Sequence, residues 1–222
     1  MFFRPWRDRR LGYPINSLVP TEYSGYPQRL TYMARETAPF TALLTLALIA
    51  AFCVEISLGG NSFCNTWGLT PADFSHTGNL APLFTHGLLH DPDAPLAHLG
   101  GNVLVLLLAG PIVERELGSV RFGVLYTMSG LVGGVLHIAV DPSSNAILVG
   151  ASGSIAGILA VLGVLRPRLL GFVAGFAAWN VWLAWSGTAG NVSFATHIGG
   201  FVAGALYCVT AHFSQKERSF TF

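Results

Sequence analysis

The chain has 222 residues, of which 52% are hydrophobic and 10% are charged, and its formal net charge is +1. A soluble domain carries about 25% charged residues, so this chain has too few to cover its surface in water, and a lipid bilayer fits its composition better. The same numbers exclude a disordered chain, a nucleic-acid-binding protein and a small secreted domain held together by disulfides. The three cysteines have no metal-ligand spacing, and we expect neither a metal nor a cofactor.

Six apolar segments are predicted to cross the membrane, each of which needs about 20 mostly apolar residues. Four uncharged segments are residues 39–54, 94–113, 122–140 and a shorter one at 150–165; two more lie within 169–215, separated by the polar run 186–191. Unpaired backbone groups are costly in lipid and no alternating barrel pattern is present, so these segments must be helices. The sequence therefore predicts an all-α membrane protein, a bundle of six transmembrane helices with a short central fourth helix.

The positive charges predict the orientation of these spans. They lie before the first span, between the second and third, between the fourth and fifth, and after the sixth; the other loops hold none. Under the positive-inside rule both termini are cytoplasmic. We therefore divide the chain into a cytoplasmic N-terminal extension (1–38), a six-span domain (39–214) and a cytoplasmic tail (215–222). The extension lacks the apolar core of a cleaved signal peptide, and the absence of a transit-type segment favours the inner membrane of a bacterial cell.

Two polar residues open the second span, where lipid should exclude them. His98 and Asn102 are four residues apart, so their side chains share one helix face, and both can donate hydrogen bonds. Polar side chains within spans are costly and are often functional. Taken alone, the pair is better explained by hydrogen bonding between helices.

A serine flanked by glycines opens the short fourth span. In Gly150-Ala151-Ser152-Gly153 the glycines allow a sharp turn and a close approach of a substrate carbonyl, as in a nucleophile turn. The helix N-terminus would favour a developing oxyanion. The alternative is simple helix packing, because Gly153 and Gly157 have the spacing of a small-residue contact face.

A histidine lies about one turn into the sixth span. His197 shares a helix face with Gly200 and Gly204, which have the same small-residue spacing as the glycines of the fourth span. Contact between these two faces would bring His197 to Ser152, and serine needs such a base to become a nucleophile. An inter-helix hydrogen bond is the alternative role for this histidine.

Other polar and aromatic residues have simpler interpretations. His86 and His90, in the loop before the second span, have metal-ligand types, but hydrogen bonds that brace the loop are favoured because no cysteine or carboxylate cluster accompanies them. His137 is interpreted as a hydrogen-bonded interface residue, and the charged run 114–116 as an anchor at the end of the second span. Three tryptophans of the fifth span form a lipid-facing or interfacial stripe: Trp179, Trp182 and Trp185.

In this order and on these spans, the motifs resemble those of the rhomboid family of intramembrane serine proteases. The resemblance covers residues 39–212. Within this range it includes the loop motif at 84–90, Glu114 and the pair at 118–119. It implies that Ser152 is the nucleophile and His197 the general base, a dyad without a carboxylate. It also implies an oxyanion hole formed by His98, Asn102 and the Ser152 backbone N–H, with Gly150 holding the turn.

The resemblance further implies acyl transfer to Ser152, followed by hydrolysis by water that enters from the outer side of the cell membrane. The substrates would be transmembrane proteins within the bilayer, admitted by movement of the fifth span and the loop before the sixth. No nucleic acid is involved, and the oligomeric state is not indicated.

The sequence departs from the family at three places, one of which is the stretch 90–95 before the second span, which is slightly longer and more acidic than usual. Many bacterial members have a Trp-Arg pair in the first loop where this chain has Ala81-Pro82, and some have an aromatic residue where it has Ala156. Something other than that ring must therefore hold His197. Two alternatives to a protease are a catalytically silent family member that binds membrane proteins, and a transporter. The transporter is disfavoured because no charged residue lies at the centre of a span.

Overall fold

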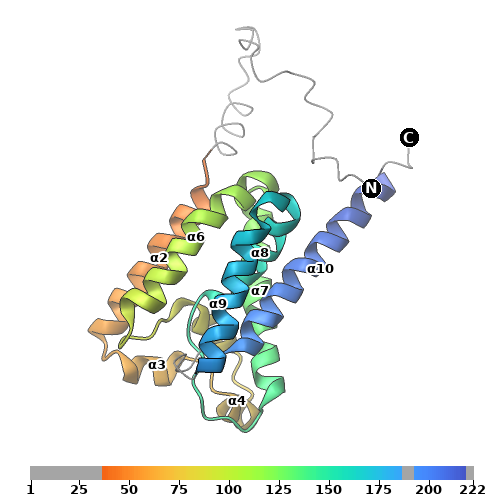
Figure 1. Cartoon of the computed structure of the whole chain (residues 1–222). Coiled ribbons are helices and arrows are strands. Elements are labelled where there is room, and N and C mark those ends of the chain that lie inside the picture. The colour runs from red at the N-terminus through yellow and green to blue at the C-terminus, as the bar shows by residue number, and fades with distance from the viewer. Residues whose placement is uncertain (1–36, 187–192, 219–222) are drawn as a thin grey trace.

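The computed structural model describes residues 37–186 and 193–218, and every regular element within these ranges is a helix (Figure 1). Residues 1–36, 187–192 and 219–222 lie outside the described ranges, and they include most of the predicted extension (1–38), most of the predicted polar run (186–191) and the end of the predicted tail (215–222). The long helices are α2 (Pro39–Ser57), α6 (Pro95–Leu117), α7 (Ser119–Val140), α8 (Ser152–Leu165), α9 (Leu170–Ser186) and α10 (Phe194–Arg218). The short ones are α3 (Asn61–Trp67), α4 (Pro71–Thr77), α5 (Ala81–Thr85), η1 (His86–Leu88) and η2 (Pro167–Leu169).

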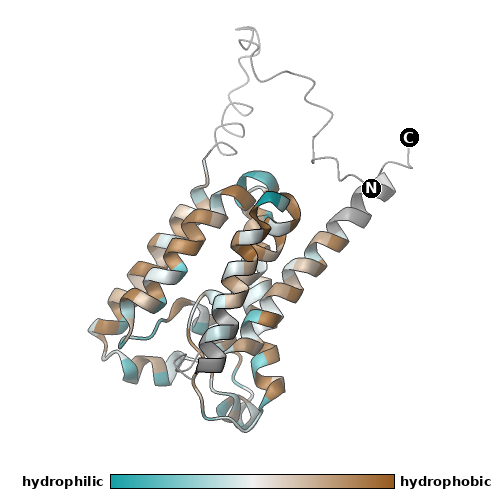
Figure 2. Cartoon of the chain, in the orientation of Figure 1, coloured by the Kyte–Doolittle hydropathy of each residue, from teal (hydrophilic) through white to brown (hydrophobic). Residues whose placement is uncertain are grey.

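Helices occupy all six places where the sequence predicts spans. Among the described residues, three of them (α2, α6 and α7) are long and apolar enough to cross a membrane, and α8 and α10 contain shorter apolar segments. These helices consist largely of apolar residues (Figure 2), and several of the apolar side chains are exposed; Leu43 and Leu46 of α2 are 64% and 65% exposed. An apolar exterior of this kind suits a hydrocarbon solvent.

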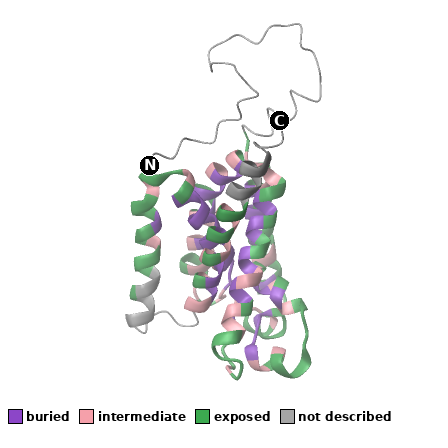
Figure 3. Ribbon diagram, turned by 90° about the vertical axis from the view of Figure 1, so that its right-hand side faces the viewer, coloured by how far each residue is buried: buried purple, intermediate pink, exposed green. Residues whose placement is uncertain are grey.

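Helix α8 lies at the centre of the bundle. Its residues from Gly153 to Gly163 are all buried, and it packs against α6, α7 and α10. Buried residues gather between the helices while exposed ones cover the outer faces (Figure 3). A helix that is apolar on every side is enclosed by other helices. Because α8 faces protein over most of its length, it can be shorter than a helix that spans the lipid.

The glycines of α8 and α10 face each other at close range. A Cβ at Gly200 would overlap the carbonyl oxygen of Gly153, and one at Gly204 would overlap that of Gly157. Gly157 also faces Ser129 of α7, with no room for a side chain. The predicted small-residue faces of the fourth and sixth spans therefore meet, and they set how closely α10 approaches α8.

The segment between α2 and α6, expected as a long loop, folds into three short helices and one 3-10 turn that the sequence did not predict. It is tied to the strand-like stretch before α8 by two backbone hydrogen bonds between Leu69 and Leu148, of 3.0 and 2.9 Å. These bonds fix the segment beside the start of α8.

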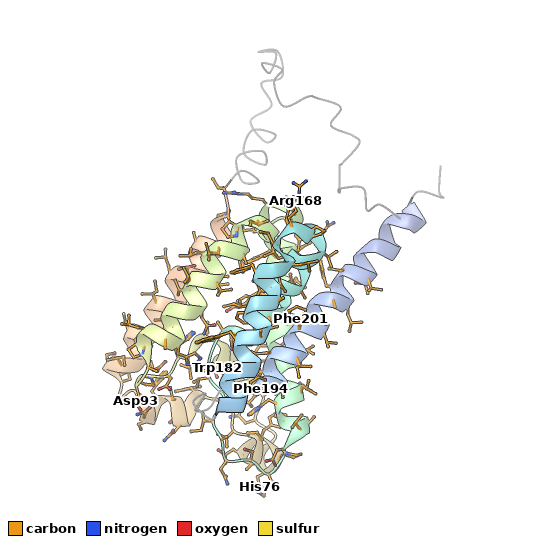
Figure 4. All side chains as sticks on the ribbon, viewed as in Figure 1. His76, Asp93, Arg168, Trp182, Phe194 and Phe201 are labelled. Atoms are coloured by element: carbon orange, nitrogen blue, oxygen red, sulfur yellow. The ribbon has the colours of Figure 1, made fainter. Side chains whose placement is uncertain are left out.

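The opposite end of the bundle is held by the predicted anchor. The Glu114 carboxylate is 1% exposed and accepts hydrogen bonds from the Phe40 and Thr41 backbones and the Ser119 hydroxyl, at 2.6–2.9 Å. Glu116 forms an ion pair with Arg166. Arg168 lies at this end, whereas His76 and Asp93 lie at the other (Figure 4). The bundle therefore has one end that carries arginines and one that carries the folded loop segment.

Candidate active site

Ser152 and His197 form a hydrogen-bonded pair. Ser152 is the first residue of α8, His197 lies one turn into α10, and the Ser152 Oγ is 2.7 Å from the His197 Nε2. The pair follows from the close contact of the two glycine faces, which leaves α10 near enough for its histidine to reach the start of α8. An imidazole nitrogen at this distance can take a proton from the hydroxyl.

The His197 ring has aromatic neighbours instead of a carboxylate. Its Nδ1 is buried and has no hydrogen-bond partner among the described residues. The rings of Phe176 in α9 and Phe194 in α10 lie 6.1 and 6.4 Å from it, centroid to centroid. Ala156 on α8 is fully buried and too small to reach the ring. The two phenylalanines therefore flank the histidine. Phe194 lies three residues before His197 on the same helix, a spacing that makes the two neighbours, whereas Phe176 becomes a neighbour only when α9 packs beside α10.

His98 has a defined hydrogen-bonding state. The Asp91 backbone N–H donates to its Nδ1 at 3.1 Å, so Nδ1 is an acceptor and the ring proton lies on Nε2. That Nε2 lies against Gly150, where a Cβ would be only 2.6 Å away. Gly150 also has a φ of +119°, and its N–H donates to the His86 carbonyl oxygen at 2.9 Å. Glycine is required here both by the backbone conformation and by the histidine.

Asn102 carries a buried donor without a partner. Its side chain lies one turn beyond His98 on α6 and is 7% exposed, and its Nδ2 makes no hydrogen bond within the described part of the chain. Leaving a buried donor unpaired costs about 1–3 kcal/mol, so an acceptor that arrives with a bound molecule is a natural partner. The start of α8 adds backbone N–H groups that have no partner inside the helix.

The loop histidines are buried and neutral. The His86 Nδ1 is 2.9 Å from the Pro82 carbonyl oxygen, so this ring braces the loop as predicted. Pro82 is one of the two positions at which the sequence comparison expected a Trp-Arg pair. Burial lowers the pKa of His86 to about 4. For the His90 ring the prediction stays open, because its nitrogens make no hydrogen bond of ordinary geometry with the described residues but interact with the Leu88 backbone. Burial and the neighbouring His98 lower the pKa of His90 to about 3. The backbone of His90 makes a bracing contact of its own.

The remaining predicted residues lie away from this pair. His137 is bonded to Ser193 at 2.8 Å between Nδ1 and Oγ, which agrees with its interpretation as an interface residue. Trp179 and Trp182 stack with ring centroids 5.0 Å apart on the exposed face of α9, while the side chain of Trp185 lies outside the described residues. Among the residues that the structure describes, no group of histidine, cysteine or acidic side chains could hold a metal ion.

Comparison with known proteins agrees with this architecture. The family model described as Rhomboid domain matches residues 77–213, which is more than half of the chain. The putative rhomboid protease YdcA of Bacillus subtilis is 30% identical over 149 residues, covering 62% of this chain and 70% of that protein. The rhomboid protease GluP of the same organism is 34% identical over 127 residues, and RHOMBOID-like protein 5 of Arabidopsis thaliana is 37% identical over 65 residues. The match spans only 24% and 21% of those two proteins.

Fold and comparisons together define a helical, multi-pass membrane protein. The chain belongs to the rhomboid family, an intramembrane protease family that acts on membrane proteins within the bilayer.

Proposed function

We propose that this protein is an intramembrane serine endopeptidase that cleaves transmembrane segments through a dyad of Ser152 and His197. The observation that carries the proposal is the 2.7 Å contact between the Ser152 Oγ and the His197 Nε2 at the N-terminus of a buried helix. Polar pairs inside membrane domains are costly, and this one has the geometry of a nucleophile and its base.

The reaction begins with attack by the Ser152 Oγ on the scissile carbonyl while the His197 Nε2 takes the hydroxyl proton. The resulting oxyanion accepts hydrogen bonds from the His98 Nε2–H, the Asn102 amide and the Ser152 backbone N–H. Collapse of this intermediate breaks the C–N bond, and His197 returns the proton to the leaving amine. The acyl group is then bound to Ser152 as an ester.

Hydrolysis completes the cycle. A water molecule loses a proton to His197 and attacks the ester, and the Ser152 oxygen leaves with that proton as the new carboxyl group is released. Two neutral histidines suit this chemistry, because His197 must accept a proton and His98 must present its Nε2–H.

The proposed topology has six spans, with residues 39–214 as the protease domain and both the extension (1–38) and the tail (215–222) in the cytoplasm. The end of the bundle that carries arginines is then cytoplasmic under the positive-inside rule. Phe194, next to the site, lies toward the opposite end from Arg168 (Figure 4). This supports cleavage near the outer face of the cell membrane, with water entering from that side. Substrates are membrane proteins whose spans unwind locally, since a helical peptide bond is shielded from attack.

The test is labelling of the purified, detergent-solubilised protein with a fluorophosphonate, beside cleavage of a model transmembrane substrate. We expect the wild type to be labelled and to cleave, and Ser152→Ala and His197→Ala to do neither while remaining folded. Ser154→Ala is the matched control, because Ser154 is a buried serine two residues further along the same helix, and it should still be labelled. Labelling that survives Ser152→Ala would contradict the dyad. A folded wild type that neither labels nor cleaves would instead indicate the catalytically silent family member.

A further inference from the structure

The far end of α2 carries a buried carboxyl group that the proposed chemistry does not use. Glu55 is fully buried, and most of the other residues of its helix are apolar. Its two oxygens have separate donors: Oε1 accepts from the Cys64 thiol at 3.2 Å, and Oε2 accepts from the His90 backbone N–H at 3.0 Å. A buried polar group of this kind is costly unless it is hydrogen-bonded, and here its bonds tie α2 to the loop segment.

The first contact joins α2 to the loop segment. Cys64 lies on α3 and is 6% exposed. Burial and the adjacent Glu55 raise the pKa of its thiol to about 12, so the group stays protonated and can donate. The same sulfur lies 3.7 Å from the His90 carbonyl oxygen, so Cys64 and Glu55 hold this one residue from both of its backbone groups.

The second contact leads directly to the candidate oxyanion hole. The residue after His90 is Asp91, and its N–H is the donor to the His98 Nδ1 at 3.1 Å. The ring of His90 also packs edge-on against that of His98, with centroids 5.1 Å apart. Two consecutive residues, one held by Glu55, therefore fix both the protonated nitrogen and the plane of the His98 ring.

We propose that Glu55 is a positioning residue for the oxyanion hole, which keeps the His98 Nε2–H directed at the reacting carbonyl by holding the backbone of His90 and Asp91. The inference rests on the proposed function, in which His98 is one of the oxyanion donors. Glu55 itself does not touch the substrate, and its effect passes through His98.

A second buried glutamate provides the matched control. Glu114 ties the other end of the same helix, α2, to α6 and is 1% exposed, but its partners are Phe40, Thr41 and Ser119, none of which contacts His98. A purely structural effect of losing a buried carboxyl group should appear in both variants, whereas an effect through His98 should appear only for Glu55.

The experiment measures kcat and KM for a model transmembrane substrate with Glu55→Ala, Glu55→Gln and Glu114→Ala, each alone and combined with His98→Ala. We expect Glu55→Ala to lower kcat by about tenfold with little change in KM, because an oxyanion donor acts mainly in the transition state. Glu55→Gln should retain most of the activity, since its amide oxygen can still accept the His90 N–H. In the His98→Ala background Glu55→Ala should cost less than about twofold, while the loss from Glu114→Ala should be unchanged.

Equal losses from Glu55→Ala in both backgrounds would overturn the proposal and leave Glu55 a structural residue. If Glu55→Ala does not fold, Cys64→Ala and Cys64→Ser are compared in the same cycle, because only serine keeps a donor to the carboxyl group. Loss of activity with alanine but not serine, confined to proteins that retain His98, supports the proposal; equal behaviour contradicts it.

A spectroscopic measurement separates this proposal from the proposed function. Nitrogen-15 NMR of labelled histidine reports which ring nitrogen of His98 carries the proton, whether or not the protein cleaves anything. We expect the Nε2-protonated form in the wild type and in Glu55→Gln, and a mixture of forms in Glu55→Ala. A protein without protease activity that still shows this change would contradict the function but support the link, and an unchanged spectrum would contradict the link alone.

Discussion

Asn102 is the residue whose surroundings most directly indicate a missing partner. It is 7% exposed, and its Nδ2 makes no hydrogen bond within the described ranges, although the neighbouring His98 is engaged through Nδ1. Unpaired buried donors are rare in folded proteins, and a bound molecule that supplies the acceptor is one explanation for such a donor. In the proposed mechanism the oxyanion is the acceptor that this amide lacks.

We expect Asn102→Ala to lower kcat by roughly ten- to a thousand-fold with a small effect on KM, the usual scale for losing one oxyanion donor. Steady-state cleavage of a model substrate measures this, with labelling by fluorophosphonate as a check that Ser152 remains accessible. An unchanged rate would remove Asn102 from the oxyanion hole and return it to the packing role.

At the scale of elements, the approach of α10 to α8 positions the dyad. Gly200 has no space for a methyl group, because its Cβ would overlap the Gly153 carbonyl oxygen, which is backbone and cannot move aside. His197 lies one turn earlier on the same helix, so any outward shift of α10 lengthens the 2.7 Å contact with Ser152. The distance between these two side chains matters because a displacement of about 1 Å can lower the rate by on the order of a hundredfold.

We predict that Gly200→Ala reduces fluorophosphonate labelling and cleavage by about a hundredfold or more while the protein remains helical. Gly175→Ala on α9 is the control, since nothing lies within 4 Å of a Cβ built there, and it should behave as the wild type. Labelling and circular dichroism of both variants decide the point. Normal labelling of Gly200→Ala would mean that the helices have more freedom than their contacts indicate.

For the whole molecule, the two buried loop histidines make stability depend on pH. The pKa of His86 is lowered to about 4 and that of His90 to about 3, against an ordinary value of about 6.5 in the unfolded chain. Above pH 6.5 both histidines are mostly neutral in the folded and in the unfolded chain, so the free energy of unfolding does not depend on them. Between pH 6.5 and these lower values the unfolded chain binds more protons than the folded one, so stability falls as the pH falls.

At pH 5 we expect each histidine to lower the free energy of unfolding by about 2 kcal/mol relative to pH 7.5. Thermal unfolding of the detergent-solubilised protein at both pH values measures this loss. His86→Gln and His90→Gln should each reduce the difference by about 2 kcal/mol, provided that the variants fold. His76→Gln, at an exposed position of α4, should leave it unchanged. A loss that is the same in all three variants would assign the acid sensitivity to other groups.

The sequence by itself determined where the six long helices lie and which residue types open them, but not the short helices between α2 and α6. Apolarity, charge placement and the spacing in Gly150-Ala151-Ser152-Gly153 are properties of short stretches of chain, so they predict helices, orientation and candidate groups without any knowledge of packing. Even the meeting of the glycine faces could be anticipated, because a helix face follows from spacing along one helix.

Only the tertiary structure decided how the candidate groups are held. The Ser152–His197 contact joins residues 45 positions apart, and the Glu55–His90 contact joins residues 35 apart. The Phe176 ring beside His197 and the path from Glu55 to His98 have no local signature. Each consists of a ring or a donor that finds its partner only after separate helices pack, and the direction of a side chain between packed helices depends on the whole bundle rather than on its own segment.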